Sequence, residues 1–250
     1  MNTKFIDKPF VAPAIVLAVA LILSFVFMAS AVKNIKATEN AITVTGSAKE
    51  RVQSDIGKVY GSYERQIARD LLSLGYKRIG EDKASIEKIF TDIGVTKEEL
   101  SIAPVSSYEV FDYNYQGVKI EGSGRMVLTQ SFTVSSSDLE KIKKVSESGE
   151  AISGKGIFIQ LQAPQYLYSK EKLAELRVTL LGKAVEDAKA RADVIAKGAG
   201  SRVSKIESAS SGVVQLLAPD SVNVEDYGSY DTTTVEKDVM VTVKAQFKLR

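Results

Sequence analysis

Neither Cys, His nor Trp occurs in the chain of 250 residues. Their absence excludes Ser–His and Cys–His nucleophile pairs, the usual zinc sites, haem ligation by His and iron–sulfur clusters. A Ser–Lys pair, a pair of carboxylates or a cation bound by oxygen atoms is the chemistry that remains open to the chain. Because there are no thiols, cysteine pairing gives no information about the compartment.

Oxygen ligands are concentrated in a stretch rich in Asp, Ser, Thr and Tyr between residues 218 and 234. It contains four carboxylates, namely Asp220, Glu225, Asp226 and Asp231. Their spacing does not match the calcium loop of an EF-hand, and we interpret the stretch as a solvated loop. The glycine pairs at 122/124 and 154/156 lack the pattern and the strand–helix context of a phosphate-binding loop, so we interpret them as turns or bulges. We therefore expect no metal and no other cofactor.

Aromatic side chains gather near Gly117, which we expect at the tip of a hairpin. The cluster consists of Tyr108, Phe111, Tyr113 and Tyr115, and Tyr166 and Tyr168 follow in a later loop. Exposed tyrosines often mark an interface. The alternative is that these rings cover the core or pair across strands. We take the four residues of the cluster as candidates for an interface between copies of the chain, and we predict no catalytic residue.

An uncharged apolar segment lies close to the N-terminus. Residues 11–32 carry no charge and, as a helix, would span roughly 33 Å, about the thickness of a bilayer core. A signal peptide would use Lys4 and Lys8 as its basic region and would be cleaved after Ala31. We favour an uncleaved anchor, because the apolar run exceeds the length of about 7–15 residues that is usual for a signal peptide.

An anchor at this position divides the chain into four parts. They are a cytoplasmic tail, residues 1–10, the transmembrane anchor, residues 11–32, a polar tether, residues 33–40, and one exported domain, residues 41–250. Lysines flank the apolar segment on both sides and do not decide its orientation. The short tail most simply stays in the cytoplasm. We therefore expect a single-pass protein of the cell membrane whose bulk is periplasmic.

The most regular helical pattern runs from Ser169 to Gly200. Its alanines recur every four residues and share one face: Ala184, Ala188, Ala192 and Ala196. Because methyl groups let a helix approach a flat surface closely, the pattern predicts a helix packed on a sheet. Asp187 and Arg191 form a favourable i,i+4 pair, which we place on the face turned away from that sheet.

Alternating and helical patterns place the remaining elements. Strands are expected over residues 41–50, 56–67, 100–113, 119–135, 156–163, 202–209 and 235–249, and helices over 70–93 and after a capping box at 137–140. Consecutive strands favour hairpins, so the expected class is α+β, with largely antiparallel sheets and packed helices behind one transmembrane helix. The order strand–helix–strand–strand occurs twice, which predicts two pseudo-repeated halves of about 41–136 and 137–250.

The charge of the chain is nearly balanced. Thirty-three Lys and Arg stand against 31 Asp and Glu, which gives a net charge of +2, and no block of like charge occurs. The chain therefore lacks the basic surface of a nucleic-acid-binding protein. The partners that we expect are the membrane, through the N-terminal helix, and other copies of the same chain.

Three stretches of the chain resemble the SIMPL-domain family of bacterial envelope proteins. They are the opening strand ITVTGSAKERV with Asp55 just beyond it, the helix end LGKAVEDAKARADVIAKGAGSRVSKIES, and the closing strand VMVTVKAQFKL. The resemblance covers about Ala41–Arg250. It implies an exported or membrane-anchored α+β protein that forms a homo-oligomer, with a link to oxidative-stress defence in some members. The family has no catalytic motif, so the resemblance assigns no catalytic residue.

Two classes of function follow. The first, which we favour, is a non-enzymatic envelope protein that assembles into a ring-like homo-oligomer and is linked to envelope or oxidative-stress defence. Beyond the anchor only Met126 and Met240 carry oxidisable sulfur, so such a protective role would be indirect. The alternative is an envelope hydrolase or ligand-binding protein that uses carboxylates or a Ser–Lys pair. A pocket in which a Ser and a Lys converge would favour this alternative.

Overall fold

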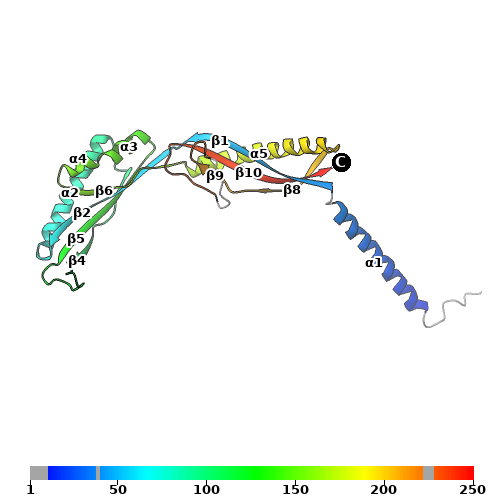
Figure 1. Ribbon diagram of the computed structural model, residues 1–250, viewed down its shortest axis with the longest axis horizontal. Helices are drawn as coiled ribbons and strands as arrows, with labels where there is room; N and C mark the ends of the chain where they lie inside the picture. The colour runs from blue at the N-terminus through cyan, green and yellow to red at the C-terminus, as the bar shows by residue number, and fades with distance from the viewer. Residues whose placement is uncertain (1–10, 38–39, 222–227) are drawn as a thin grey trace, which may run out of the picture. The chain divides into compact units, whose positions relative to one another are not determined.

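The computed structural model describes residues 11–37, 40–221 and 228–250. The helices, labelled in Figure 1, are α1 (Val11–Ala37), α2 (Leu72–Ile93), α3 (Leu139–Glu147), α4 (Gly149–Ser153) and α5 (Lys170–Gly198). The strands are β1 (Ala41–Gln53), β2 (Ile56–Ala68), β3 (Leu100–Ile102), β4 (Ser106–Val110), β5 (Arg125–Ser136), β6 (Phe158–Leu161), β7 (Gln165–Leu167), β8 (Val203–Ser211), β9 (Gln215–Leu217) and β10 (Glu236–Leu249).

The strands form two sheets with helices packed on them, and the expected α+β class is confirmed. One sheet has four strands in the order β1-β10-β8, and β9 also pairs with β10. The other has six strands in the order β3-β5-β2-β6, while β4 pairs with β5 and β7 pairs with β2. The pairs β8–β10, β2–β5 and β2–β6 are antiparallel.

The chain divides into two compact units rather than into consecutive halves. Unit 1 combines Met1–Ala48, Leu181–Gly212 and Val241–Arg250, and unit 2 combines Lys49–Leu180 and Val213–Met240. This division differs from the expected halves of about 41–136 and 137–250. The strand expected over 156–163 pairs with β2 as β6, whereas β1 belongs to the same sheet as β10 and β8.

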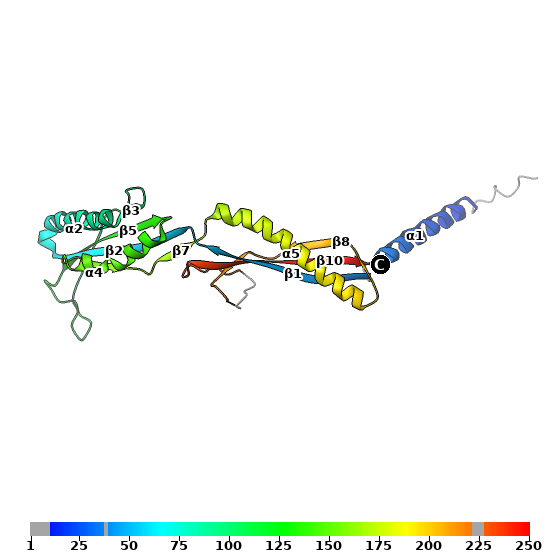
Figure 2. The ribbon, with the colours of Figure 1, turned by 90° about the horizontal axis from the view of Figure 1, so that it is seen from above.

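The core of unit 1 forms where α5 lies on the strands, as Figure 2 shows. All four alanines of the predicted row are at most 1 % exposed, which confirms that this face of α5 packs on the sheet. Three of them, Ala184, Ala188 and Ala192, form one cluster with the buried side chains of Val44, Val243, Ala245 and Phe247. Gly46 of β1 permits this contact, because a Cβ added there would lie 2.1 Å from the carbonyl oxygen of Ala184.

Asp187 of α5 reaches back to the sheet instead of facing away from it. Its carboxylate accepts a hydrogen bond from the backbone N–H of Ser47 in β1, at 2.8 Å, and also pairs with Arg191 at 2.9 Å. The bond from Ser47, followed by that from Arg191, lowers the pKa of Asp187. The placement of this pair on the outer face was therefore wrong for Asp187, because its carboxylate binds the backbone of β1.

The core of unit 2 lies between its sheet and the helices α2, α3 and α4. Alternate residues of β2 and β5 point into it, including Val59, Tyr63, Leu128 and Phe132. The helices contribute Ile79, Ile86, Phe90, Ile142, Val145 and Ile152. The predicted shared face of Met126, Leu128, Phe132 and Val134 is confirmed, with only Met126 partly exposed. The intervening residues of these strands point to the opposite face, on which no described helix lies.

The long strand expected over 100–113 is divided into β3 and β4. Pro104 lies between them and has no N–H with which to continue the ladder. Beyond β4, the connection 111–124 contains one isolated bridge, between Tyr113 and Lys119. The helix after residue 137 also begins one residue later than expected, because Asp138, and not Ser137, accepts the capping hydrogen bond from the N–H of Lys141.

The apolar helix α1 includes Pro13–Ser30, the one stretch among the described residues that is long and apolar enough to cross a membrane. The side chains of this stretch are exposed. A signal sequence near the N-terminus can also be long and apolar enough to meet this condition, so α1 is compatible with an anchor and with a signal sequence. The helix continues to Ala37, which places residues 33–37 of the expected tether inside it.

Candidate functional site

The four interface candidates lie on β4 and in the connection that follows it, and they differ in exposure. Tyr108 is 52 % exposed, Tyr113 is 61 % exposed and Tyr115 is fully exposed. Phe111 is instead half-buried, and the ammonium group of Lys119 lies 3.2 Å from the centre of its ring. The tyrosines are therefore accessible to a partner, whereas the ring of Phe111 makes a cation–π contact with Lys119.

The tip of the connection is held in one conformation by Asn114. Its side-chain oxygen accepts hydrogen bonds from the N–H groups of Gln116, at 3.0 Å, and Val118, at 2.9 Å. Gly117 takes a φ of +74°, a region that a residue without a Cβ adopts at little cost. The turn thus presents Tyr115 on an ordered backbone, which reduces the entropy lost when a partner binds.

The base of the connection is fixed by Asp112. Arg125 of β5 donates two hydrogen bonds to its carboxylate, at 2.9 and 3.1 Å. The hydroxyl of Ser123 accepts a hydrogen bond from the N–H of Asp112 at 2.9 Å. Two parallel Arg–carboxylate bonds set the direction of both groups, so the connection leaves β5 at a defined angle.

Two further apolar side chains of the connection are exposed, namely Val118 at 59 % and Ile120 at 46 %. We call the hairpin surface the set Tyr108, Tyr113, Tyr115, Val118 and Ile120. Val118 and Ile120 were not among the residues predicted from the sequence, although their alternation with Lys119 across the tip indicates a strand-like exposed face. Aromatic and aliphatic groups concentrated on one ordered loop are typical of a protein interface.

The side chains of Ser169 and Lys172 come close together because both contact the carboxylate of Asp55. The hydroxyl of Ser169 donates to Asp55 Oδ2 at 2.7 Å, its N–H donates to Oδ1 at 2.7 Å, and Lys172 Nζ lies 3.0 Å from Oδ2. A hollow of about 1020 Å³ is lined by Asp55 and Lys172. Burial alone would raise the pKa of Asp55, but the bonds from Ser169 and Lys172 hold it below its usual value.

This arrangement does not prepare Ser169 for nucleophilic attack. A Ser–Lys mechanism requires a neutral lysine that accepts the hydroxyl proton. The hydrogen bond to Asp55 instead raises the pKa of Lys172, so the ammonium form is stabilised. Asp55 accepts the hydrogen bond of the Ser169 N–H, directly before the first residue of α5, as the carboxylate of a capping box does for the N-cap residue. The cluster is therefore a structural device at the start of α5.

The described carboxylates of the loop 218–234 are separated by their own partners. Asp220 pairs with Arg51 at 2.8 Å, and Asp231 pairs with Lys237 at 3.0 Å. Glu225 and Asp226 lie outside the described residues. Among the described residues, no group of three Asp or Glu side chains is close enough to hold a metal ion.

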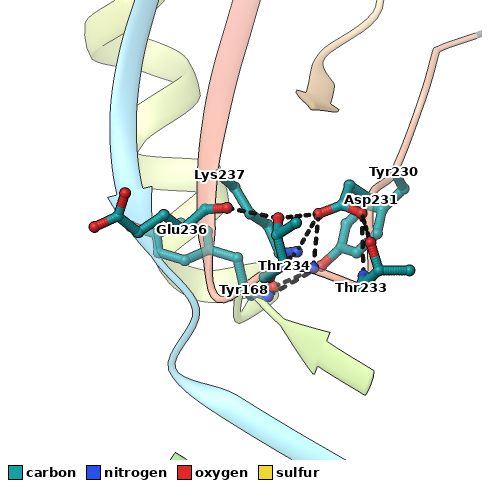
Figure 3. A network of polar contacts seen from close by, with 7 residues as sticks. All are labelled: Tyr168, Tyr230, Asp231, Thr233, Thr234, Glu236 and Lys237. Atoms are coloured by element: carbon teal, nitrogen blue, oxygen red, sulfur yellow. Dashed lines mark hydrogen bonds and ion pairs between the residues drawn. The ribbon is translucent and has the colours of Figure 1, made fainter. Parts of the chain in front are cut away.

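Figure 3 shows the polar network around Asp231. The carboxylate accepts hydrogen bonds from the N–H groups and hydroxyls of Thr233 and Thr234, and from Lys237 Nζ. Lys237 is fully buried and donates a second bond to the carbonyl oxygen of Thr234, at 2.8 Å. Burial alone would raise the pKa of Asp231, but these bonds hold it well below its usual value. The network fixes the last part of the loop to the start of β10.

The two tyrosines of the later loop have partners within the fold. Tyr230 donates its hydroxyl proton to the carbonyl oxygen of Tyr168 at 3.0 Å, and its oxygen lies 3.2 Å from the N–H of Tyr168 (Figure 3). The N–H of Tyr166 donates to the carbonyl oxygen of Thr232 at 2.8 Å. Both residues are half-buried, and burial raises the pKa of Tyr168. They therefore hold the loop rather than extend the hairpin surface.

The glycine pairs form turns, as predicted. Gly122 has a φ of +77° and Gly156 a φ of +74°, both in the left-handed region. Neither residue opens a helix, which separates them from the glycines of a phosphate-binding loop.

The chain was also compared with known proteins. No curated protein matches it. A family model for SIMPL, described as a protein of unknown function (DUF541), matches residues 42–247. The matched region contains both sheets and the helices that cover them. The chain belongs to the SIMPL (DUF541) family.

Proposed function

We propose that the protein is a non-enzymatic, membrane-anchored protein of the cell envelope that assembles with copies of itself through the hairpin surface. The exposure of Tyr113 and Tyr115 on an ordered turn carries this proposal. Tyrosine supplies a large contact area at a low cost in side-chain entropy, and it is enriched among residues that dominate binding. The surface belongs to unit 2 alone, so it is complete in each copy.

The proposed anchor favours assembly. With the N-terminus in the cytoplasm and residues 41–250 outside the membrane, all copies share one plane, which raises their effective concentration. Weak contacts are then sufficient. A ring is the expected form, because head-to-tail contacts between identical copies stop growing only when the rotation closes.

The polar clusters support a role without catalysis. Ser169 and Lys172 are both engaged by Asp55, and the carboxylates Asp220 and Asp231 are paired with different cations. A hydrolase that used a Ser–Lys pair would need this lysine neutral. The proposal extends to envelope or oxidative-stress defence only in an indirect form, since Met126 and Met240 are partly buried and no thiol is present.

The variant Tyr113→Ser/Tyr115→Ser tests the interface. We expect the dissociation constant of the assembly to rise at least about tenfold, because tyrosine is enriched among the interface residues whose truncation costs about 2 kcal/mol or more. The full chain in detergent is measured by light scattering over a dilution series. Its far-ultraviolet circular dichroism should stay unchanged, because both side chains lie outside the core.

Phe158→Ser is the matched control, because Phe158 is an equally exposed aromatic residue of unit 2, at 59 %, on β6. Its particle mass should equal that of the unmodified chain at every concentration. Equal masses for the tyrosine variant and the unmodified chain would remove the hairpin surface from the interface. A weakening of the same size in both variants would show a general effect of aromatic exposure and would also contradict the proposal.

A further inference from the structure

The open face of the sheet in unit 2 contains a hollow of about 510 Å³. It lies over β2, β5 and β6, on the face opposite to α2, α3 and α4. Its rim and walls are side chains that alternate with the core residues of these strands: Tyr60, Ser62, Ser131, Thr133, Gln160 and Gln162. The backbone between them belongs to Gly61, Phe132 and Leu161, whose side-chain positions face the core.

The strand register explains why this part of the face is hollow. Ser62 of β2 lies opposite Ser131 of β5 on one side and Gln160 of β6 on the other. Tyr60 lies opposite Thr133 in the next row of the same face. Two small serines therefore form the centre, and longer side chains stand around them.

The six polar side chains of the hollow have a common property. Four carry hydroxyl groups and two carry amides, so each can both donate and accept a hydrogen bond. None of the six makes a side-chain hydrogen bond to another described residue. The fold does not use these groups, and they remain available to a ligand.

The hollow also differs in charge from the other hollows of unit 2. No charged side chain lines it. Lys83, Lys88 and Lys97 line the hollow beside α2, and the hollow near the connection 111–124 is lined by Asp70 and Glu109, among others. An ionic ligand needs a counter-charge when it leaves water, and this lining offers none. The lining of the hollow therefore favours an uncharged ligand.

We propose that this hollow binds a neutral oligosaccharide. A sugar presents many hydroxyl groups that both donate and accept hydrogen bonds. The six side chains of the hollow have the same property, so they can pair with these hydroxyl groups in either direction. The ring C–H bonds of a sugar can lie against an aromatic face, and the half-buried ring of Tyr60 supplies one. Neighbouring strands lie about 4.8 Å apart, so they offer hydrogen-bonding groups in regular rows along a chain of sugar rings. The inference is independent of the proposed assembly.

The test uses the full chain in a detergent without a sugar headgroup, because a glycoside detergent would compete. Chitotetraose and cellotetraose serve as probes in saturation-transfer difference NMR and in titration calorimetry. We expect saturation to reach the ring protons of at least one tetrasaccharide. Gln160→Ala/Gln162→Ala should weaken that binding at least about tenfold, and Ser131→Trp, which fills the centre, should abolish it.

Gln116→Ala is the matched control, because Gln116 is an exposed glutamine outside the hollow. It should bind the tetrasaccharide with unchanged affinity. Absence of transfer to both probes at millimolar concentration would overturn the proposal, as would equal binding by the Gln160→Ala/Gln162→Ala variant. A change of particle mass in Ser131→Trp would assign the face to a contact between copies and would overturn it as well.

Discussion

Gly46→Ala should lower the free energy of unfolding by about 3 kcal/mol, the upper end of the range for an overpacked core. A Cβ at this position would lie 2.1 Å from Ala184 O, 2.4 Å from Ala188 N and 2.7 Å from Ala188 Cβ. Two of these atoms are backbone and cannot move without the whole helix. The variant must therefore displace α5 from β1 and open the contact of the alanine row with the sheet.

Gly182→Ala is the matched control, because Gly182 lies in α5 itself and its new Cβ would meet no heavy atom within 4 Å apart from the adjoining backbone of its own helix. Alanine should stabilise this helix position by about 1 kcal/mol. Thermal unfolding of the full chain in detergent, followed by circular dichroism, measures both variants. Midpoints that shift equally in the two variants would show that α5 does not rest on Gly46.

Asp231→Asn should destabilise the protein by about 3 kcal/mol or more, as expected when a buried ion pair loses one partner. The substitution keeps the shape of the side chain but leaves the ammonium of Lys237, which is fully buried, without a counter-charge. Asp231→Asn/Lys237→Met should recover much of this loss, because the buried charge is then absent as well. Denaturant unfolding of the three chains forms a double-mutant cycle.

Asp220→Asn is the control for this cycle. The Asp220 side chain is 83 % exposed and pairs with Arg51 at the surface, so we expect a change within about 0.5 kcal/mol. An equal effect of Asp220→Asn and Asp231→Asn would contradict the account of the buried pair. So would a double variant that is less stable than Asp231→Asn.

The same pair predicts a dependence on pH. The pKa of Asp231 is lower in the folded protein than in the unfolded chain, where it is about 3.9. Its contribution to stability is therefore complete above the unfolded value and is lost as the pH falls from about 4 towards the folded pKa. Asp231→Asn should lack this part of the acid destabilisation of the unmodified chain.

The elements that depend on local periodicity could be predicted from the sequence. The alanine row of α5 and the alternation of Val239, Val241 and Val243 each bury one face whatever the partner is. Element bounds failed where single residues interrupt a pattern, as Pro104 does between β3 and β4. The pairing of β1 with β10 joins distant parts of the chain, and a local pattern carries no information about it.

In the polar sites, too, some features follow from local sequence and others depend on contacts between distant parts of the chain. The sequence placed Tyr113 and Tyr115 beside the glycine of a hairpin but left open whether they are exposed or cover the core, and the structure shows them exposed. The burial of Lys237 could not be predicted, because a buried lysine depends on the position of its counter-ion, which the fold of the loop sets. Tyr60 and Ser62 lie on the alternate face of their strand, between Lys58 and Glu64. The importance of this pair became apparent only when the register placed Ser131 and Gln160 beside it.

The most direct test of anchored assembly is the mass of the particle extracted from membranes with detergent. Light scattering gives the protein mass after subtraction of the detergent, and mass spectrometry gives the mass of the intact chain. We expect detergent to be required, the chain to retain its own N-terminus, and the particle to contain several copies. A particle with the mass of one chain at high concentration, or a chain that begins at Val32 in the soluble fraction, would contradict the account.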